Sequence, residues 1–469
     1  MFKKLGSFIT ALLVANTLFS QDITGQWNGS LTIQGTQLRL VFHLVKSENT
    51  YSATMDSPDQ GAKDIPVTQT RFENGLLTIE MPSFQISYSG ELKDSLIVGV
   101  FKQAGMQFPM NLSRKPIEKV TLKRPQTPTE PYPYYTEDVT FANPIAHAVF
   151  AGTLTMPKKR GHFPAVILIS GSGPQNRDEE LFGHKPFLVL ADYLTKHGIA
   201  VLRFDDRGVG HSTGNFKEAT SAVFATDVER AIAYLKTRKE IDASKIGLMG
   251  HSEGGVIAPM VAVSNPSNVA FIVLLAGTGM RGDSLLLLQA GLIAEKSGIP
   301  SEEIRKTVAF NKLVFDVILH AKSLDELEQV LTHKIQLAIE SDSSVSVPEG
   351  MDHKQFIKAQ VQELSSPWFR YFVAYDPIPT LEKLTCPVLA VNGENDIQVP
   401  SNENLTAIEK AVKKGGNNNV TCIAFPGLNH LFQECSTCSI EEYGALEQTF
   451  SPKALDAITQ WIINQTTEK

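Results

Sequence analysis

The fold is decided by the stretch Ile246-Gly247-Leu248-Met249-Gly250-His251-Ser252-Glu253-Gly254-Gly255-Val256-Ile257-Ala258. Its first four residues are typical of a buried strand, and the apolar residues from Val256 onward indicate a helix. Between them lies a G-x-S-x-G sequence. Only a sharp turn from strand to helix exposes a serine hydroxyl above a sheet, and the flanking glycines keep side chains out of that corner. The stretch therefore predicts a nucleophile elbow with Ser252 at its tip.

A second G-x-S-x-G sequence, Gly210 to Gly214, lies earlier in the chain. Its serine, Ser212, follows the polar residues 205–209, and no apolar helix follows it. Because this copy lacks both flanking elements, Ser212 is interpreted as a turn residue. Ser252 is the predicted nucleophile.

Strand and helix patterns alternate on both sides of the elbow. This rhythm is typical of a mainly parallel, doubly wound α/β sheet. Continuous apolar runs predict strands at 149–156, 165–169, 199–204, 246–249, 271–275, 387–391 and 420–425. Helical spacing predicts helices at 186–197, 224–235 and 452–464.

Residues 281–378 interrupt the alternation. Helices are predicted at 284–296, 302–319 and 324–340, with no clear strand among them. A helical cap inserted between two sheet strands can cover a pocket and exclude water. Trp368, Phe369 and Tyr371 near its end are interpreted either as core packing or as the lining of an acyl pocket.

A serine hydroxyl needs a base, and the base needs an acid that orients it. In this fold the acid and then the histidine follow the serine in chain order. Asp396 follows the strand at 387–391, with Glu394 as its rival, and His430 follows the strand at 420–425. His251 is expected only to pack, because neighbours on an elbow point apart.

A reaction at Ser252 would also need two backbone donors for an oxyanion. One is expected from the N–H of Glu253, at the start of the following helix. The other is assigned to the N–H of Ser172, in the small-residue loop Ser170 to Pro174. Residue spacing suggests neither a metal site nor a phosphate loop, so no cofactor is expected. Asp205-Asp206-Arg207-Gly208 is interpreted as structural, with Arg207 tying loops together.

The first part of the chain differs in character. Residues 1–20 combine Lys3 and Lys4 with an apolar run, which is typical of a cleavable signal peptide rather than of a membrane anchor. Residues 21–114 alternate with period two, and Asn74-Gly75 marks a hairpin, so a small all-β barrel or sandwich is expected. Five prolines at 115–134 predict an extended, semi-rigid linker.

Cysteines and charge add three expectations. Cys435 and Cys438 are interpreted as a local disulfide, with a free pair as the alternative, and Cys386 and Cys422 as buried thiols. A net charge of −7 gives no electrostatic reason to expect a nucleic acid partner. No segment after the leader reaches bilayer-spanning length, so stable membrane insertion is not expected. The oligomeric state is left open, a homo-oligomer included.

Residues 135–469 resemble bacterial α/β-hydrolases of the serine aminopeptidase-like (S33-type) esterase group. The resemblance rests on Ser170 to Glu179, Phe204 to Gly210, Gly250 to Gly255, Asn392 to Pro400 and Asn429-His430. It implies an α/β-hydrolase fold with Ser252, Asp396 and His430 as the triad. The front module is similar to the lipocalin-like domain of some secreted esterases.

Three classes of function follow. The first is a periplasmic or secreted hydrolase of small acyl esters that forms an acyl-enzyme. The second is a peptidase with the same triad, in which Glu253 or Asp376 would recognise a peptide terminus. The third is a binding protein with a vestigial hydrolase, which the intact triad disfavours. Export disfavours a thioesterase that uses coenzyme A.

Overall fold

The computed structural model describes residues 22–33, 36–48, 50–103, 106–118, 123–341 and 352–467. The expected leader at 1–20 lies outside these residues. The chain divides into two compact units, one formed mainly by the first 119 residues and the other mainly by the rest. The two units are described in turn.

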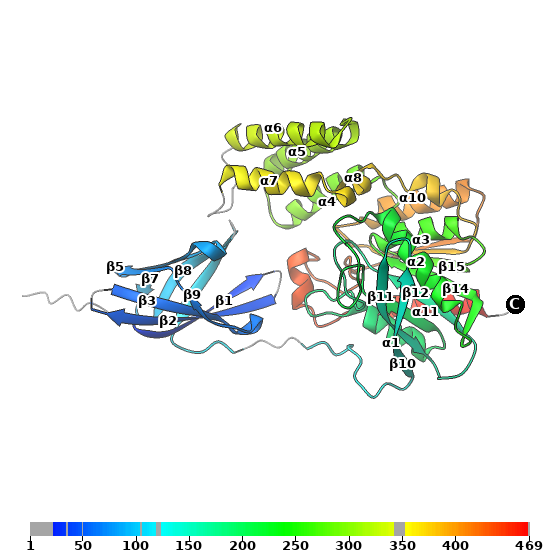
Figure 1. Cartoon of the computed structure of the whole chain (residues 1–469), viewed down its shortest axis with the longest axis horizontal. Helices are drawn as coiled ribbons and strands as arrows, with labels where there is room; N and C mark the ends of the chain where they lie inside the picture. Colours follow the sequence, from blue (N-terminus) through cyan, green and yellow to red (C-terminus); the bar gives the residue numbers. More distant parts are fainter. Residues whose placement is uncertain are drawn as a thin grey trace, which may run out of the picture. The chain divides into compact units, whose positions relative to one another are not determined.

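The first unit is one antiparallel sheet in the order β4-β3-β2-β1-β9-β8-β7-β6-β5 (Figure 1). Each strand pairs with its neighbour in the chain, except that β4 does not pair with β5, and the first strand pairs with the last. The strands are β1 (Gly25–Ile33), β2 (Thr36–Ser47), β3 (Thr50–Ser57), β4 (Ala62–Pro66), β5 (Gln69–Glu73), β6 (Leu76–Met81), β7 (Ile86–Lys93), β8 (Leu96–Gln103) and β9 (Met106–Ser113).

The two ends of this sheet are linked through two consecutive residues, Val67 and Thr68. Val67 N–H donates to the Ala53 carbonyl on β3, and Thr68 N–H donates to the Glu80 carbonyl on β6, both at 3.1 Å. The antiparallel pairings around the ring make β4 and β5 run in the same direction. They therefore act as one strand with a bend between them. The sheet follows the path of an up-and-down barrel, so of the two expected forms the barrel is the one observed.

Local sequence explains much of this barrel. Asn74 and Gly75 have φ values of 52° and 80°, as a two-residue hairpin turn between β5 and β6 requires. The alternating residues Leu40, Phe42 and Leu44 of β2 are buried. The predicted hairpin and the period-two strand are both confirmed.

The second unit is built on an eight-stranded sheet in the order β10-β11-β13-β12-β14-β15-β16-β17. The pairs β10-β11 and β11-β13 are antiparallel, and all the remaining pairs in this order are parallel. This mainly parallel sheet confirms the expected α/β fold. The strands are β10 (Tyr135–Asn143), β11 (Ala148–Met156), β12 (Phe163–Ile169), β13 (Ala200–Phe204), β14 (Ile241–His251), β15 (Phe271–Leu275), β16 (Val388–Gly393) and β17 (Val420–Phe425).

Helices cover both faces of this sheet because the central strands are apolar on both sides. Ala165, Ile167 and Ile169 of β12 join one buried cluster, whereas Val166 and Leu168 join the other. The first cluster includes residues of α2 (Ser221–Leu235), α3 (Gly254–Ser264) and α10 (Ser401–Lys414). The second includes residues of α1 (Pro186–Lys196) and α11 (Pro452–Thr466).

The strand order reverses at β12, which lies between β13 and β14. The chain thus passes from β12 to β13 on one side of it and then crosses back to form β14 on the other side. Such a reversal opens a crevice at the carboxyl ends of the two strands, where ligands bind in open α/β sheets. The loops that begin at Ser170 and Ser252 start from these two ends.

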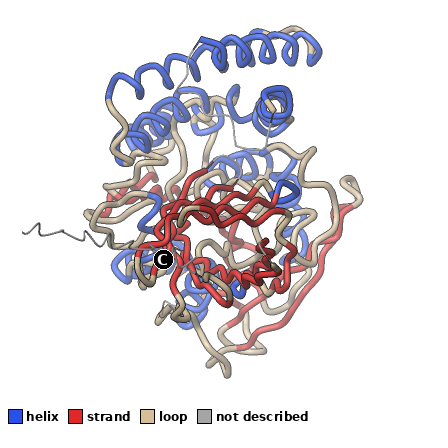
Figure 2. Tube along the Cα trace, turned by 90° about the vertical axis from the view of Figure 1, so that its left-hand side faces the viewer, coloured by secondary structure: helices blue, strands red, loops and turns tan. Residues whose placement is uncertain are grey.

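The cap contains more helices than the sequence predicts. The three predicted helices are α4 (Gly282–Lys296), α5 (Ser301–His320) and α6 (Leu324–Ser341), and α7 (His353–Leu364) and α8 (Pro367–Ala374) follow them. A short helix, α9 (Ile378–Leu381), leads back to the sheet. Figures 1 and 2 show the cap helices gathered as one group without a strand among them. Their shared core includes Phe315, Leu331, Ile335 and Val361.

The linker is more firmly attached than its composition suggests. Between residues 123 and 134 it forms no helix or strand. However, the Arg124 guanidinium donates to the carbonyls of Phe182, Gly444 and Leu446, and Gln126 bonds to the backbone of Thr449 and Phe450. The absence of helix and strand agrees with the expected extended segment, and these bonds attach it to loops of the second unit. A side chain that satisfies several loop carbonyls at once fixes an otherwise extended segment.

Candidate active site

Ser252 stands at a strained corner between β14 and α3. Its φ of 51° lies in the left-handed region, which residues with a side chain rarely adopt. Its N–H donates to the Leu275 carbonyl on β15 at 2.8 Å, which fixes the corner to the sheet. A Cβ at Gly250 would collide with the Gly254 carbonyl, and one at Gly254 would collide with the Ile169 carbonyl. Glycine is required at both positions because backbone segments touch there and leave no room for a Cβ.

Ser212 occupies a different environment. Its Oγ donates to the Asp205 carbonyl at 2.7 Å and accepts from the Ala151 N–H at 2.9 Å. The side chain is buried in the loop after β13. Ser212 thus holds a turn against β11, as predicted.

The structure brings the predicted acid and base together. His430 Nδ1 lies 2.7 Å from Asp396 Oδ2, and both side chains are buried. The other oxygen, Asp396 Oδ1, accepts from the N–H groups of Gln398 and Val399 at 2.7 and 2.8 Å. These two bonds fix the rotation of the carboxylate. Its rival, Glu394, is exposed.

The loop after β12 lies against the nucleophile. A Cβ at Gly171 would come within 3.3 Å of Ser252 Cβ, so the loop backbone passes directly beside Ser252. The Gly171 N–H is engaged by Glu179 Oε1 at 2.7 Å. Within the described residues, the N–H groups of Ser172 and Glu253 have no acceptor. Two backbone N–H groups without an acceptor, one next to Ser252 in the chain and one in the loop beside it, are what an oxyanion site would require.

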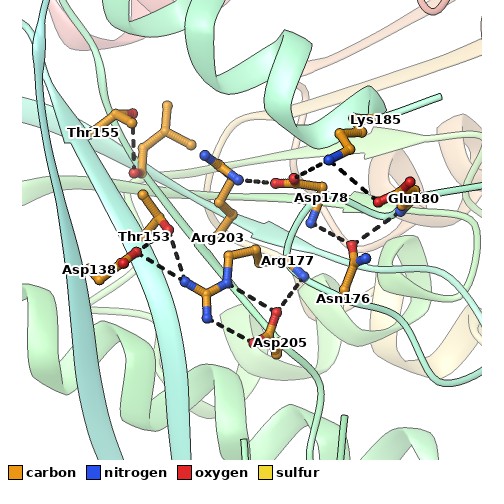
Figure 3. Close-up of polar contacts among 11 residues, drawn as sticks. Asp138, Thr153, Thr155, Asn176, Arg177, Asp178, Glu180, Lys185, Arg203 and Asp205 are labelled. Atoms are coloured by element: carbon orange, nitrogen blue, oxygen red, sulfur yellow. Dashed lines mark hydrogen bonds and ion pairs between the residues drawn. The ribbon is translucent and has the colours of Figure 1, made fainter. Parts of the chain in front are cut away.

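A polar network holds this loop in place (Figure 3). Arg177 binds Asp205 through Nε at 3.0 Å and Nη2 at 2.8 Å, and also reaches Asp138 and Thr153 on β10 and β11. Burial acts to raise the pKa of Asp205, but the bonds from Arg177 lower it below its ordinary value. Arg203 of β13 pairs with Asp178 in the same way. The network ties the loop to three strands.

The Asp205-Asp206-Arg207 segment is structural, as predicted. Arg207 forms two hydrogen bonds to the buried carboxylate of Asp227 on α2, at 2.6 and 2.8 Å. Asp206 accepts from Ser170 Oγ at 2.7 Å and from the Gln175 N–H at 2.9 Å. Burial raises the pKa of Asp206 to about 7. Asp206 thus supports the loop after β12, whereas Arg207 ties the loop after β13 to α2.

The cap is hydrogen-bonded to the elbow through Trp368. Trp368 Nε1 of α8 donates to the buried Glu253 carboxylate at 2.9 Å, and Ser221 Oγ donates to the same group at 2.6 Å. Burial raises the pKa of Glu253. The aromatic residues interpreted as core packing or as an acyl pocket pack mainly on other aromatic rings. Phe369 packs on Phe315 within the cap, and Tyr371 stacks on Tyr375.

Trp368→Phe is expected to lower the free energy of unfolding by about 1–3 kcal/mol at neutral pH, because the buried Glu253 carboxylate loses a donor. The loss should shrink as the pH falls through the raised pKa of Glu253, since a protonated carboxyl needs less compensation. Urea unfolding between pH 4 and 8 measures both effects. The matched control is Trp461→Phe, because the Trp461 indole nitrogen bonds to no described residue. An equal loss in both variants would contradict the role of the hydrogen bond.

Two further side chains belong to the site, and the sequence does not predict their contact. His251 Nδ1 lies 3.0 Å from Glu179 Oε1, and His251 Nε2 lies 3.2 Å from the His430 carbonyl oxygen. The prediction that His251 only packs is therefore incomplete, because both of its ring nitrogens lie at hydrogen-bond distance from oxygen atoms. The available signal is the histidine next to the nucleophile, since a buried imidazole requires hydrogen-bond partners.

Several other predictions concern the surroundings of the site. Cys435 and Cys438 form a disulfide, and Cys386 and Cys422 are free thiols. In the described part of the chain, no cluster of three or more His, Cys, Asp or Glu side chains could hold a metal ion. Likewise, no described helix has both the length and the apolar character that a bilayer crossing needs.

Comparison with known proteins agrees with this architecture. Residues 185–298 match the family model of serine aminopeptidase, S33. The chain is 25% identical over 314 residues to esterase EstD of Thermotoga maritima, a match that covers 66% of this chain and 65% of the esterase. The match thus spans slightly less than two thirds of that relative's length.

Solved structures with similar folds include the α/β-hydrolase GrgF from Penicillium sp. sh18, at 16% identity and a TM-score of 0.43, covering 71% of this chain and 99% of that one. Est1E from Butyrivibrio proteoclasticus, solved with ferulic acid, has 16% identity and a TM-score of 0.41, covering 70% and 100%. Strand order and elbow show that this chain contains a domain with the α/β-hydrolase fold, in which residues 185–298 are similar to serine aminopeptidase, S33.

Proposed function

We propose that this protein is a serine hydrolase that cleaves small carboxylic esters through an acyl-enzyme. The observation that carries the proposal is the 2.7 Å bond between His430 Nδ1 and Asp396 Oδ2, in a unit whose elbow strains Ser252. Ser252 Oγ attacks the ester carbonyl while His430 Nε2 takes its proton. His430 then protonates the leaving alcohol, and the reverse sequence with water releases the acid.

The surrounding groups have defined tasks in this mechanism. Asp396 keeps the proton of His430 on Nδ1, so that Nε2 can act as a base. The N–H groups of Glu253 and Ser172 would bind the oxyanion of the tetrahedral intermediate. Each such donor contributes about 100- to 1,000-fold in rate.

Peptide cleavage has less support. Glu253, one candidate for recognising a peptide terminus, already accepts from Ser221 and Trp368. The other, Asp376, is exposed and caps the backbone N–H of Ile378. Neither carboxylate is free within a site, which favours the ester as substrate.

The deciding assay compares acyl p-nitrophenyl esters of graded chain length with aminoacyl p-nitroanilides. Ester turnover is expected to exceed amide turnover by several orders of magnitude. Amide turnover above ester turnover would replace this proposal with the peptidase.

Export to the periplasm or the medium is part of the proposal. It rests on the leader sequence at 1–20 and agrees with the Cys435–Cys438 disulfide, since disulfides persist in oxidising compartments. Expression of the full sequence in a bacterium, followed by N-terminal sequencing, is expected to find cleavage near Ser20. Recovery of uncleaved protein from the cytoplasm would contradict it.

A further inference from the structure

The histidine before the nucleophile is buried between two acceptors. His251 is 7% exposed and Glu179 is 5% exposed. The contact at Nδ1 is a carboxylate oxygen at 3.0 Å, and the contact at Nε2 is a backbone carbonyl oxygen at 3.2 Å. Both ring nitrogens therefore face oxygen atoms at hydrogen-bond distance.

The number of ring N–H protons needed to bond both acceptors restricts the protonation state of His251. A carbonyl oxygen can only accept, and an ionised carboxylate can only accept. Glu179 Oε1 also receives the Gly171 N–H at 2.7 Å. A neutral imidazole has one N–H, so it can serve only one of the two acceptors. An imidazolium serves both.

The electrostatic surroundings favour the charged form. Burial acts to lower the pKa of His251, but the Glu179 carboxylate outweighs it and raises the pKa above its ordinary value. The other ionisable groups near the pair are Asp396, the His430 ring at 4.9 Å, and Asp206 on the side of Glu179. The remaining surroundings are apolar, with Phe187, Leu190, Leu275, Leu431, Phe432 and Phe450 among them.

The pair joins three segments of the site. Glu179 holds the loop of the oxyanion donors through Gly171, His251 belongs to the elbow, and the His430 carbonyl belongs to the loop of the base. We propose that Glu179 and His251 are positioning residues, with His251 a doubly protonated bridge that fixes the oxyanion loop and the base relative to Ser252. This inference rests on the proposed function, because it assigns the bridge a role in ester hydrolysis.

The bridge depends on pH in a defined direction. Because the pKa of His251 is raised on folding, the bridge is complete below the ordinary value of about 6.5 and is lost as the pH rises through the folded value. Loss of the proton leaves one N–H, so one of the two links must break. The kcat should therefore fall as the pH rises, although His430 can still act as the base there.

The variant that separates charge from shape is Glu179→Gln. The amide oxygen can still accept from Gly171 and His251, but without the charge the pKa of His251 should fall. The alkaline fall in kcat should move to lower pH by the same amount, with KM unchanged. His251→Asn should lower kcat about 100-fold at all pH values, since misplaced reacting groups cost that much. Glu180→Gln is the matched control and should keep the profile of the unmodified protein.

Nitrogen NMR of the histidine-labelled full chain tests the protonation state directly. Two ring N–H protons on His251 at pH 6 are expected, whereas a single ring N–H would overturn the inference. A Glu179→Gln profile that falls equally at every pH would also overturn it, because a purely structural role predicts that result.

The two proposals can fail separately. If the protein turns over no ester and a fluorophosphonate does not label Ser252, the proposed function fails, and the positioning role in ester hydrolysis fails with it. If esters are hydrolysed but His251 carries one ring proton, only the bridge fails. The NMR measurement is made on the unmodified protein, so it depends neither on turnover nor on whether a variant folds.

Discussion

Ser252→Ala is expected to lower kcat for ester hydrolysis by about 10⁶-fold, the loss that follows when the nucleophile of a triad is removed. Alanine has no oxygen to form the acyl-enzyme. The backbone should be unaffected, because the elbow is fixed by the bond from the residue 252 N–H to the Leu275 carbonyl. Steady-state rates with a p-nitrophenyl ester, and loss of fluorophosphonate labelling, measure the effect.

The matched control is Ser212→Ala, which alters the other G-x-S-x-G sequence. It should keep its rate and its labelling but lose about 1 kcal/mol of stability, since two buried hydrogen bonds to the backbone disappear. Activity that survives Ser252→Ala and disappears in Ser212→Ala would contradict the assignment of the elbow.

Asp396→Asn is expected to lower kcat by about 10⁴-fold, with a smaller effect on KM. The two backbone N–H groups of Gln398 and Val399 require an oxygen at the Oδ1 position. The new amide nitrogen must then face His430 Nδ1 and donate to it. This contact forces the proton of the neutral ring onto Nε2, the atom that should accept the proton of Ser252.

Histidine NMR of the variant should show this change of tautomer, and urea unfolding should show that the protein remains folded. Glu394→Gln is the control, because that carboxylate is exposed and lies two residues away. An equal loss of rate in both variants would mean that Asp396 is not the orienting acid.

The parts of the fold that local sequence determines are predictable. Strands buried on both faces, such as β12 and β15, appear as continuous apolar runs, and the elbow is determined by glycines within a few residues of Ser252. Chain order and position after a predicted strand favour Asp396 over Glu394 and select His430, and the structure brings Asp396 and His430 to 2.7 Å.

The parts that depend on distant contacts are not predictable from local pattern. The bridge between Glu179 and His251 joins residues 72 positions apart, and neither residue carries a periodic signal. Trp368 meets Glu253 only because the cap returns over the elbow. Both meetings depend on contacts that sequence spacing does not encode. The strand β10 is a different case, because it is absent from the predicted strands although its buried residues Val139 and Phe141 alternate with other residues in the sequence.

The bend shared by β4 and β5 has a consequence for association between molecules. An ordinary open sheet exposes two rows of unpaired N–H and C=O groups, which can template pairing with another chain. In the first unit the segment around Val67 and Thr68 bonds to β3 on one side and β6 on the other, so little free strand edge remains there. The bonds of Val67 and Thr68 cover part of the edge that β4 and β5 leave unpaired, so the front module offers another chain less free edge than an open sheet would.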